Sequence, residues 1–474
     1  MTGNPHPLLV PGGSLARTFN RRSFLGVAGG LAATTVLAAC GSDGGSGGQS
    51  STGGGSPTGG TSGSSAGGTS AGASGSPSGT AGSGASRPTA DLTVWTTTRF
   101  TPNGDAAVPK AAADYAKKFG GSVTVQGFPP NDLLDKITTA VSGGGGPDVI
   151  IFDISQIAPL AAANLVTDIT SKFDSLKDLY YPGDTAGANF QGKQYAVPYD
   201  TNNVALFWNK QMFAKAGIDS APTTWDDLLA AAKELTGGDQ YGYMLGAKGY
   251  GSFLFWPWLW QNGGTILSDD NTKATFNDAA GAEAWQFYAD LYLKHNVVPP
   301  SFLSVSNSWD QFTAPFIQEK VAMMPIGAWG IQPVQDGNPK LEFDIAPLPK
   351  NKAAGTVIGG DGIAITTTSK SPDAAWAFIE WMTAAEQEPV IESYDLLPSR
   401  KDAVESEWVT KSPFNTVFAK QGAAGVARPA VANWSDIEWG VMADAWDSVI
   451  QKSASPADAL NKAAEQTNAK LAGS

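Results

Sequence analysis

The chain is poor in cysteine and histidine, the residues that most zinc sites and many catalytic centres use. It has one cysteine and two histidines in 474 residues. A lone cysteine excludes an intramolecular disulfide and a zinc site built from several cysteines. Beyond the first forty residues the only histidine is His295, which argues against a Ser-His-Asp triad and against a His-rich metal site. A Walker A loop and a glycine-rich dinucleotide motif are also missing, so we expect no cofactor and no metal.

Positive charge is scarce as well. The chain carries 31 Lys and Arg against 44 Asp and Glu, a formal net charge of −13. Residues 1–39 hold three arginines and no acidic residue, so their removal changes this charge to −16. An acidic protein repels phosphate backbones, and we therefore expect no nucleic-acid ligand.

The N-terminal region has the features of an export signal. The adjacent Arg21 and Arg22 precede an apolar run at residues 24–39. These sixteen residues are fewer than the roughly 20 that a membrane-spanning helix needs, which excludes a permanent transmembrane helix here. A basic region, a short apolar region and small residues before a cleavage site are typical of a secretory signal. The paired arginines resemble the twin-arginine export signal, so we expect residues 1–39 to be a signal peptide.

The single cysteine, Cys40, follows this signal directly. The motif Leu-Ala-Ala-Cys at residues 37–40 resembles the bacterial lipobox, in which the thiol is lipidated and the chain is cut before it. The alternative is an incidental cysteine. Acyl chains on Cys40 would anchor the protein to the outer face of the cell membrane through burial of their hydrocarbon. We therefore expect an exported, lipid-anchored protein.

Residues 40–89 contain no aromatic residue and consist mainly of Gly, Ser, Thr and Ala. Such a segment cannot bury enough apolar area to offset its ordering entropy. We interpret it as a tether, with a root-mean-square reach on the order of 40 Å.

The remaining sequence indicates an α/β protein. Apolar runs at 92–95, 123–125 and 147–152 predict strands, and the last run suits a strand buried on both faces. Asn131, Thr224 and Ser371 predict helix starts. Alternating strands and helices favour mostly parallel sheets, whose ligands bind beyond the carboxyl ends of the strands. Because about 385 residues exceed one compact core, we expect two lobes.

Four segments carry a family resemblance. They are GKQYAVPY at 192–199 followed by VALFWNK at 204–210, PTTWDDL at 222–228, KVAMM at 320–324 leading to GAW at 327–329, and GGDGIAI at 359–365. In this order and spacing they resemble the family 1 extracellular solute-binding proteins of ABC importers, the group that contains maltose-binding protein.

The resemblance implies a two-lobed, periplasmic-binding-protein-like fold of type II with a hinge and an interlobe cleft. Lobe one would comprise residues 91–198 and 350–395, and lobe two would comprise 203–349 and 397–474. The protein would be a monomer that captures a carbohydrate between its lobes and delivers it to the permease subunits of an ABC transporter.

Aromatic rings can cover the apolar C–H faces of a sugar, and several tryptophans lie in loop-like settings. The leading candidates, Trp329 and Trp258, also match family positions that often face the cleft. For each tryptophan the alternative is a place in the core. The sequence leaves open whether Trp256, Trp260 and Trp439 face the cleft or the core. The ligand-binding tryptophans predicted are Trp95, Trp258, Trp329 and Trp434.

Polar candidates follow strands or lie at the expected hinge. A capping or turn role is the alternative for each aspartate, and a surface salt bridge is the alternative for the arginine. The glycine would let a ligand approach the backbone. The polar ligand-binding residues predicted are Asp153, Tyr199, Asp200, Gly360, Asp361 and Arg428.

Two other functions fit the same composition. An anchored glycosidase would also be exported, aromatic-rich and acidic, and it would need two carboxylates across the scissile bond. A binder of another solute, such as a polyamine or a peptide, would combine aromatic and acidic residues. The ordered family segments and the absence of a recognisable catalytic motif favour a carbohydrate binder over an enzyme.

Overall fold

The computed structural model describes residues 87–99, 102–305 and 308–473. The expected signal peptide, Cys40 and nearly all of the tether lie outside the described residues. Within the described part of the chain, every helix is too short or too polar to cross a bilayer.

A five-stranded sheet combines residues 91–198 with the later strand at 361–365, and we call this sheet, with the helices packed on it, lobe one. The sheet order is β2-β1-β3-β12-β6. The central strand pairs are parallel, but β12 runs antiparallel to both β3 and β6. The strands are β1 (Asp91–Thr97), β2 (Ser122–Phe128), β3 (Val149–Asp153), β6 (Val197–Pro198) and β12 (Asp361–Ile365).

A second sheet, which we call lobe two together with its helices, has the order β14-β11-β7-β9-β8, and β10 and β13 also pair with β7. The long strand β7 is antiparallel to β9, β10, β11 and β13. The expectation of mostly parallel sheets is therefore wrong, because strands that return through the hinge enter each sheet in the reverse direction. The strands are β7 (Asp200–Asn209), β8 (Tyr241–Tyr243), β9 (Val321–Gly327), β10 (Phe343–Ala346), β11 (Thr356–Gly359), β13 (Leu397–Pro398) and β14 (Gly425–Ala427).

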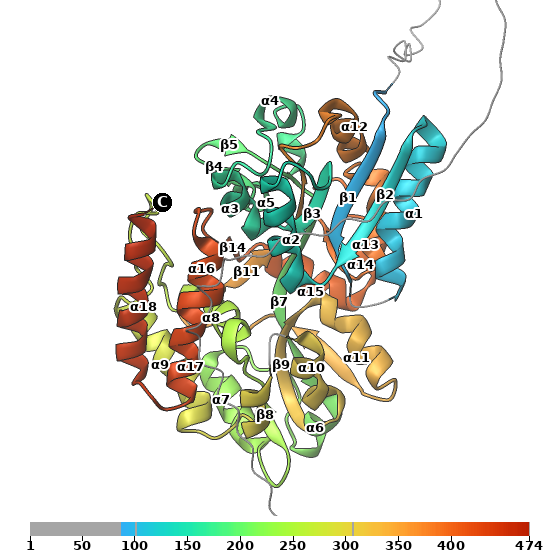
Figure 1. Cartoon of the computed structure of the whole chain (residues 1–474). Coiled ribbons are helices and arrows are strands. Elements are labelled where there is room, and N and C mark those ends of the chain that lie inside the picture. Colours follow the sequence, from blue (N-terminus) through green and yellow to red (C-terminus); the bar gives the residue numbers. More distant parts are fainter. Residues whose placement is uncertain (1–86, 100–101, 306–307, 474) are drawn as a thin grey trace, which may run out of the picture. The chain divides into compact units, whose positions relative to one another are not determined.

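Helices pack on both sheets (Figure 1). Those of lobe one are α1 (Pro102–Phe119), α2 (Pro130–Ser142), α3 (Ile157–Ala162), α4 (Thr170–Phe173), α5 (Pro182–Ala186), α12 (Pro372–Met382) and α13 (Glu388–Glu392), and a short hairpin joins β4 (Asn189–Phe190) to β5 (Lys193–Gln194). Those of lobe two are α6 (Lys210–Lys215), α7 (Trp225–Glu234), α8 (Lys248–Gln261), α9 (Ala279–Leu293), α10 (Trp309–Ile317), α11 (Ile331–Gly337), α14 (Glu407–Lys411), α15 (Pro413–Gly422), α16 (Trp434–Asp436), α17 (Ala443–Ile450) and α18 (Pro456–Leu471).

The helix starts follow local sequence chemistry. Thr224 and Asp227 form the expected capping box at the start of α7, in which the Thr224 side chain accepts from the Asp227 N–H. Helix α12 begins at Pro372 as predicted. Helix α2 begins at Pro130 with Pro129 in the capping position, so the start expected at Asn131 lies inside the helix.

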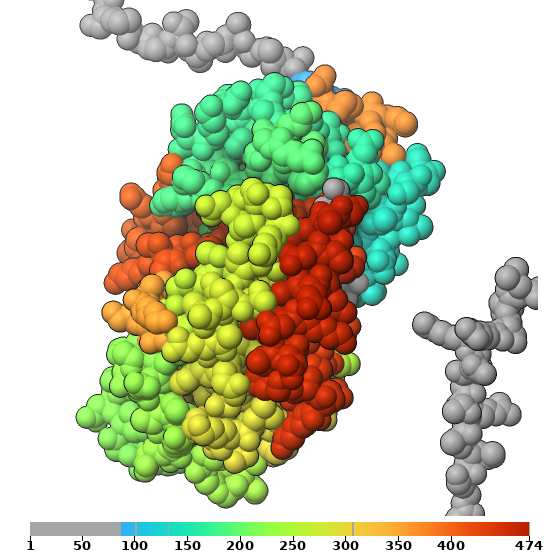
Figure 2. Space-filling view, turned by 90° about the vertical axis from the view of Figure 1, so that its left-hand side faces the viewer, coloured from blue at the N-terminus to red at the C-terminus, as the bar shows by residue number. Residues whose placement is uncertain are grey.

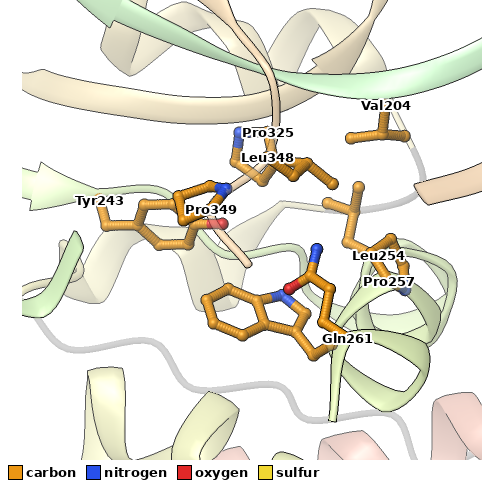
Figure 3. A pocket seen from close by; sticks show the side chains of 9 residues that line it. Val204, Tyr243, Leu254, Pro257, Gln261, Pro325, Leu348 and Pro349 are labelled. Atoms are coloured by element: carbon orange, nitrogen blue, oxygen red, sulfur yellow. The ribbon is translucent and has the colours of Figure 1, made fainter. Parts of the chain in front are cut away.

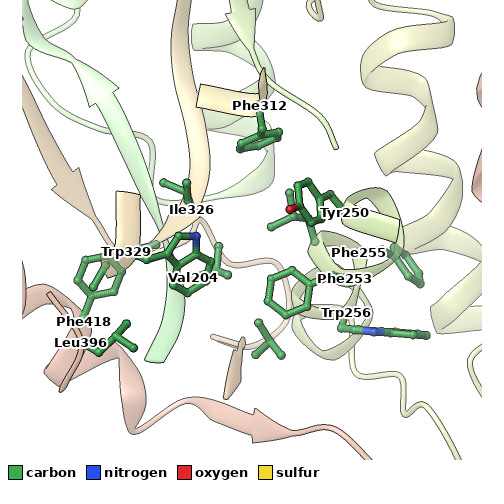
Figure 4. Packing of buried hydrophobic residues seen from close by; sticks show 14 of the residues in the cluster. Val204, Tyr250, Phe253, Phe255, Trp256, Phe312, Ile326, Trp329, Leu396 and Phe418 are labelled. Atoms are coloured by element: carbon green, nitrogen blue, oxygen red, sulfur yellow. The ribbon is translucent and has the colours of Figure 1, made fainter. Parts of the chain in front are cut away.

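Successive residues of β3 are buried on opposite faces, as predicted for a strand covered on both faces. Val149 and Ile151 belong to one hydrophobic cluster, whereas Ile150 and Phe152 belong to another. The larger cluster continues through lobe two, where Figure 4 shows part of its aromatic packing. Figure 2 shows the C-terminal α18, in red, lying against the segment around α9, in yellow.

The chain crosses between the lobes where β6 leads into β7, where β11 leads into β12, and again between α13 and β13 (Figure 1). Gly360, the single residue between β11 and β12, has φ +124°, a backbone conformation that favours glycine. A Cβ on this residue would lie 2.2 Å from the carbonyl oxygen of Asp200, so the first two crossings touch. Strand β11, which falls inside the range expected for lobe one, pairs in the lobe-two sheet. The residue ranges given above for the lobes stay a prediction.

Candidate functional site

Five aromatic side chains of lobe two gather beside the start of α8, and we call them the aromatic group. Tyr250 stacks on Trp309 with ring centroids 3.9 Å apart, and Trp309 meets Trp329 edge to face at 5.4 Å. Phe253 stacks with Trp439 at 6.3 Å, and Trp439 also contacts Tyr250. Tyr250, Phe253 and Trp329 are buried, whereas Trp309 and Trp439 are only half-buried. The two half-buried rings can therefore meet a ligand.

Trp329 is placed in the aromatic group by the turn that follows β9. Trp329 lies in a 3₁₀ turn (Ala328–Gly330) directly after β9. Its ring covers Gly327, where a Cβ would come within 1.8 Å of it, so the glycine makes room for the ring. Figure 4 shows Trp329 in the same packed region as Tyr250 and Phe253. The indole Nε1 of Trp329 is buried and has no hydrogen-bond acceptor among the described residues.

Arg428 connects the aromatic group to lobe one. Its guanidinium lies over the Phe253 ring, 5.4 Å from the centroid. Nη2 donates to Asp153 Oδ1 at 2.9 Å, and Nη1 donates to Glu438 Oε2 at 3.0 Å. Asp153 is the last residue of β3, and Arg428 follows β14 directly. The ion pair with Asp153 therefore joins the two lobes.

A second charged cluster lies at the hinge. Arg99 Nη1 is 2.7 Å from Asp361 Oδ2, and Arg99 Nη2 is 4.0 Å from Asp200 Oδ2. The guanidinium also lies 4.3 Å from the ring centroid of Tyr394. Burial, and then the neighbouring Asp361 carboxylate, raise the pKa of Asp200 well above its ordinary value. Burial also raises the pKa of Asp361, although Arg99 opposes this shift.

The structure brings most of the predicted polar residues into these two clusters. Asp153 and Arg428 form the ion pair between the lobes. Asp200, Asp361 and Gly360 meet at the hinge, where Asp361 N donates to Asp200 Oδ1 at 2.9 Å. Tyr199 is buried beside them, and its N–H donates to the Asp361 carbonyl oxygen.

Of the predicted tryptophans, only Trp329 belongs to the aromatic group. Trp258 is buried among the rings of other lobe-two residues, with centroids 5.0 Å from Trp225 and 5.6 Å from Phe287. Trp434 is fully buried, and its Nε1 donates to Glu438 at 3.1 Å. Other side chains cover both rings, which favours a packing role, and their contact with the ligand stays a prediction.

Trp95 is half-buried and packs edge to face on Phe128 in lobe one at 5.0 Å. Its place in the ligand site stays a prediction. The three tryptophans that the sequence left open lie in different settings. Trp256 is fully buried, Trp260 packs half-buried against the core, and Trp439 joins the aromatic group.

Sequence reasoning missed several residues of these clusters. Tyr250 and Phe253 lie in an apolar run that gives no sign of which face is open. Arg99 follows the first strand, and the rule that ligands bind beyond carboxyl ends of strands could have selected it. Glu438 carries no local signal, because the residues that it contacts are distant in the sequence or one helical turn away.

A small cavity inside lobe two is a separate feature (Figure 3). It has a volume of about 10 Å³ and is lined by Val204, Tyr243, Trp258 and Gln261, among others. This volume suits one water molecule at most, so the cavity cannot hold a sugar. Among the described residues, no group of acidic, histidine or cysteine side chains could hold a metal ion.

The clusters thus combine aromatic faces with charged groups that bridge the two lobes, an arrangement that suits a ligand site between lobes. A model of the bacterial extracellular solute-binding protein family matches residues 110–416, and the chain belongs to this family.

Relatives and solved structures agree with this assignment. The diacetylchitobiose-binding protein DasA of Streptomyces coelicolor is 24% identical over 387 residues, which cover 80% of this chain and 90% of that protein. The galactooligosaccharide-binding protein of Bacillus subtilis is 21% identical, over 77% of this chain and 86% of that protein.

Among solved structures, the GacH receptor of Streptomyces glaucescens, determined unliganded and with acarbose, is 26% identical with a TM-score of 0.71. The match covers 81% of this chain and 98% of that one. An ABC transporter solute-binding protein of Thermotoga lettingae bound to tagatose is 25% identical with a TM-score of 0.73, over 81% of this chain and all of that one. These likenesses confirm the predicted two-lobed fold.

Proposed function

We propose that this chain captures a carbohydrate outside the cell and delivers it to an ABC transporter. The observation that carries the proposal is the aromatic group of lobe two, which Arg428 connects to Asp153 of lobe one. Stacked rings suit the C–H faces of sugar rings, and charged side chains suit their hydroxyls. The names of the relatives and of the bound ligands in the similar structures support the same class of ligand.

Trp329 is buried, and we expect it to contact the sugar through its indole N–H. A buried indole N–H without an acceptor costs about 1 to 3 kcal/mol. A ligand hydroxyl next to Nε1 would remove this cost while the ring face covers the sugar. Trp439 and Trp309, which are half-buried, would extend the stacking surface.

The charged groups support binding over catalysis. The carboxylates of Asp153 and Glu438 are both held by Arg428, and that of Asp361 is held by Arg99. A glycosidase would need one carboxyl free to protonate the leaving group and a second free to attack or to activate water. We therefore propose that the protein is a binder and not an enzyme.

We further propose that the protein is exported through the twin-arginine route and anchored by lipid on Cys40. The paired Arg21 and Arg22 and the lipobox-like motif at 37–40 support this part of the proposal. A tether at residues 40–89 would keep the folded part near the membrane and its permease partners. We also propose that the protein acts as a monomer.

A polyamine is the second candidate ligand, because the two clusters are acidic. Asp153, Asp200, Asp361 and Glu438 outnumber Arg99 and Arg428, the two arginines that they face. Carboxyl groups in excess of arginines favour a cationic ligand, because a cation beside them stabilises their charged forms.

A thermal-shift screen of the purified protein decides between these ligands. The panel should contain neutral mono- and oligosaccharides, matched uronic acids, and spermidine. A ligand at 100 times its dissociation constant adds about 2.7 kcal/mol to the free energy of unfolding, which gives a clear shift. Shifts confined to sugars that remain intact after long incubation would support the proposal. Cleavage products would identify an enzyme, and a shift with spermidine alone would identify a polyamine binder.

A further inference from the structure

Arg428 is held far more firmly in lobe two than in lobe one. Its side chain is 3% exposed, and its lobe-two partner Glu438 is fully buried. The Glu438 carboxylate also accepts from Trp256 Nε1 at 2.9 Å and from Trp434 Nε1 at 3.1 Å. With three donors around it, this carboxylate fixes one side of the guanidinium.

Local backbone geometry places Glu438 for this contact. It lies in a π-helical segment, Ile437–Met442, and such segments are rare and frequent at functional sites. The Glu438 carbonyl oxygen also accepts from Ser252 Oγ at 2.9 Å, which ties the segment to α8. The anchor of Arg428 is therefore built from two elements of lobe two.

The other partner of Arg428 is Asp153. Breaking this contact does not leave an unpaired charge buried in the protein. Asp153 has a side chain that is 36% exposed, and its Oδ1 also accepts from Ser155 N at 2.9 Å as the cap of a 3₁₀ turn. If the lobes part, water can solvate Asp153, and Arg428 keeps its partner Glu438. Breaking a buried ion pair usually leaves one charge uncompensated. Here Glu438 still compensates Arg428 after Asp153 has moved away. The bridge is therefore reversible.

We propose that the Arg428–Asp153 bridge is a latch that favours the closed arrangement of the lobes before any ligand binds, with Glu438 as the residue that positions Arg428. If a ligand binds only the closed arrangement, its apparent dissociation constant equals the intrinsic constant divided by the fraction of protein that is closed. The latch raises the closed fraction and with it the affinity. Removal of the latch should open the ligand-free protein and weaken ligand binding roughly 5- to 30-fold.

The direct test measures the distance between the lobes without ligand. The full chain carries Cys40→Ser, so that spin labels attach only at Lys117→Cys in lobe one and Lys215→Cys in lobe two, both exposed. Asp153→Asn removes the charge but keeps an oxygen that can cap the turn. The control is Asp373→Asn, which breaks an ion pair with Lys172 at 3.0 Å inside lobe one.

We expect Asp153→Asn to increase the population with a long label distance, and Asp373→Asn to leave the distribution as in the parent protein. Glu438→Gln should act in the opposite direction, because opening would then leave the buried Arg428 without a compensating charge, and Asp153→Asn should remove this shift in the double variant. Equal distributions in the parent, Asp153→Asn and Asp373→Asn would overturn the proposal.

A second measurement needs no variant that could misfold. Raising NaCl from about 0.05 M to about 1 M weakens the pair only at its exposed Asp153 end, because Arg428 is 3% exposed. The parent distribution should then move part of the way toward that of Asp153→Asn at low salt, and a move toward shorter distances would contradict the latch. The distance readout requires no ligand, so it stands independently of the carbohydrate proposal. Only the affinity effect, measured by titration with the sugar found in the screen, depends on that proposal.

Discussion

The carboxylate of Asp200 accepts a hydrogen bond from the backbone N–H of Asp361 at 2.9 Å. Asp200 begins the strand that enters lobe two, and Asp361 begins the strand that returns to lobe one. The two crossings are therefore tied at one point, with Gly360 pressed against the Asp200 backbone. Rotation of the lobes must be absorbed by the backbone torsions around these residues.

A side chain at Gly360 should disrupt this point. In Gly360→Ala the new Cβ would meet the Asp200 carbonyl oxygen at 2.2 Å and would also force a positive φ on alanine. We expect a loss of about 3 kcal/mol or more in the free energy of unfolding, measured by urea denaturation.

Gly192→Ala is the matched control. Gly192 also has a positive φ, +77°, but a Cβ there would meet no atom within 4 Å. The control should lose only about 1 to 2 kcal/mol, the cost of the backbone conformation alone. Equal losses in the two variants would mean that the contact with Asp200 does not constrain the hinge.

The sequence predicted the type of the few elements that carry a local signal, but it did not predict the order in which the strands pair around the hinge. Local signals such as the Thr224 capping box and the apolar run of β3 depend on neighbouring residues, so they could be read from the chain. The antiparallel pairing of β12 with β3 joins segments about 210 residues apart, and local patterns carry no information about it.

The same limit explains the site. Asp153 ends β3, Asp361 begins β12 and Arg428 follows β14. The sequence could indicate these positions at strand ends. Whether a tryptophan faces a ligand or a core depends on helices that pack on it from elsewhere in the chain. Trp258 and Trp329 therefore looked equivalent in the sequence, but Trp258 lies among core rings and Trp329 in the aromatic group.

Trp258 and Trp329 should accordingly respond differently to truncation. Trp258→Ala would leave a cavity beside Trp225 and Phe287, so we expect a loss of about 3 to 5 kcal/mol in the free energy of unfolding. The folded fraction of this variant should bind its ligand with an affinity close to that of the parent. Urea denaturation and calorimetric titration measure the two effects separately. A large loss of affinity with unchanged stability would return Trp258 to the ligand site.

Asp184 should make stability depend on pH. Burial raises its pKa to about 6, above the ordinary 3.8, and Thr201 Oγ1 donates to its carboxylate at 2.8 Å. Between about pH 4 and pH 6 the folded state binds more protons at this residue than the unfolded state does. The contribution of Asp184 to stability is therefore fully present at low pH and falls as the pH rises through this window.

Asp184→Asn removes this titration. Relative to the parent protein, the variant should gain on the order of 1 to 3 kcal/mol in the free energy of unfolding between pH 4 and pH 7. Urea denaturation of both proteins at the two pH values measures the gain. A constant difference across this range would show that folding does not shift the pKa of Asp184.

Membrane attachment should depend on Cys40. Without the thiol no acyl chain can be attached, so Cys40→Ser should move the protein from the membrane fraction to the soluble exported fraction. Fractionation of cells that express either form, followed by immunoblotting, measures this. Retention of the variant in the membrane fraction to the same extent as the parent would exclude lipid anchoring at this residue. Changing Arg21 and Arg22 to Lys should separately block export if the twin-arginine route is used.

Calorimetric titration of the parent protein and of Trp329→Ala with the sugar found in the screen shows whether the aromatic group binds a carbohydrate. Truncation removes the ring and the Nε1 donor together, so we expect a loss of about 2 to 4 kcal/mol in binding free energy, or roughly 30- to 1,000-fold in the dissociation constant. The thermal unfolding of the ligand-free variant should show that it remains folded. An unchanged dissociation constant in folded Trp329→Ala would contradict the assignment of the sugar to this site.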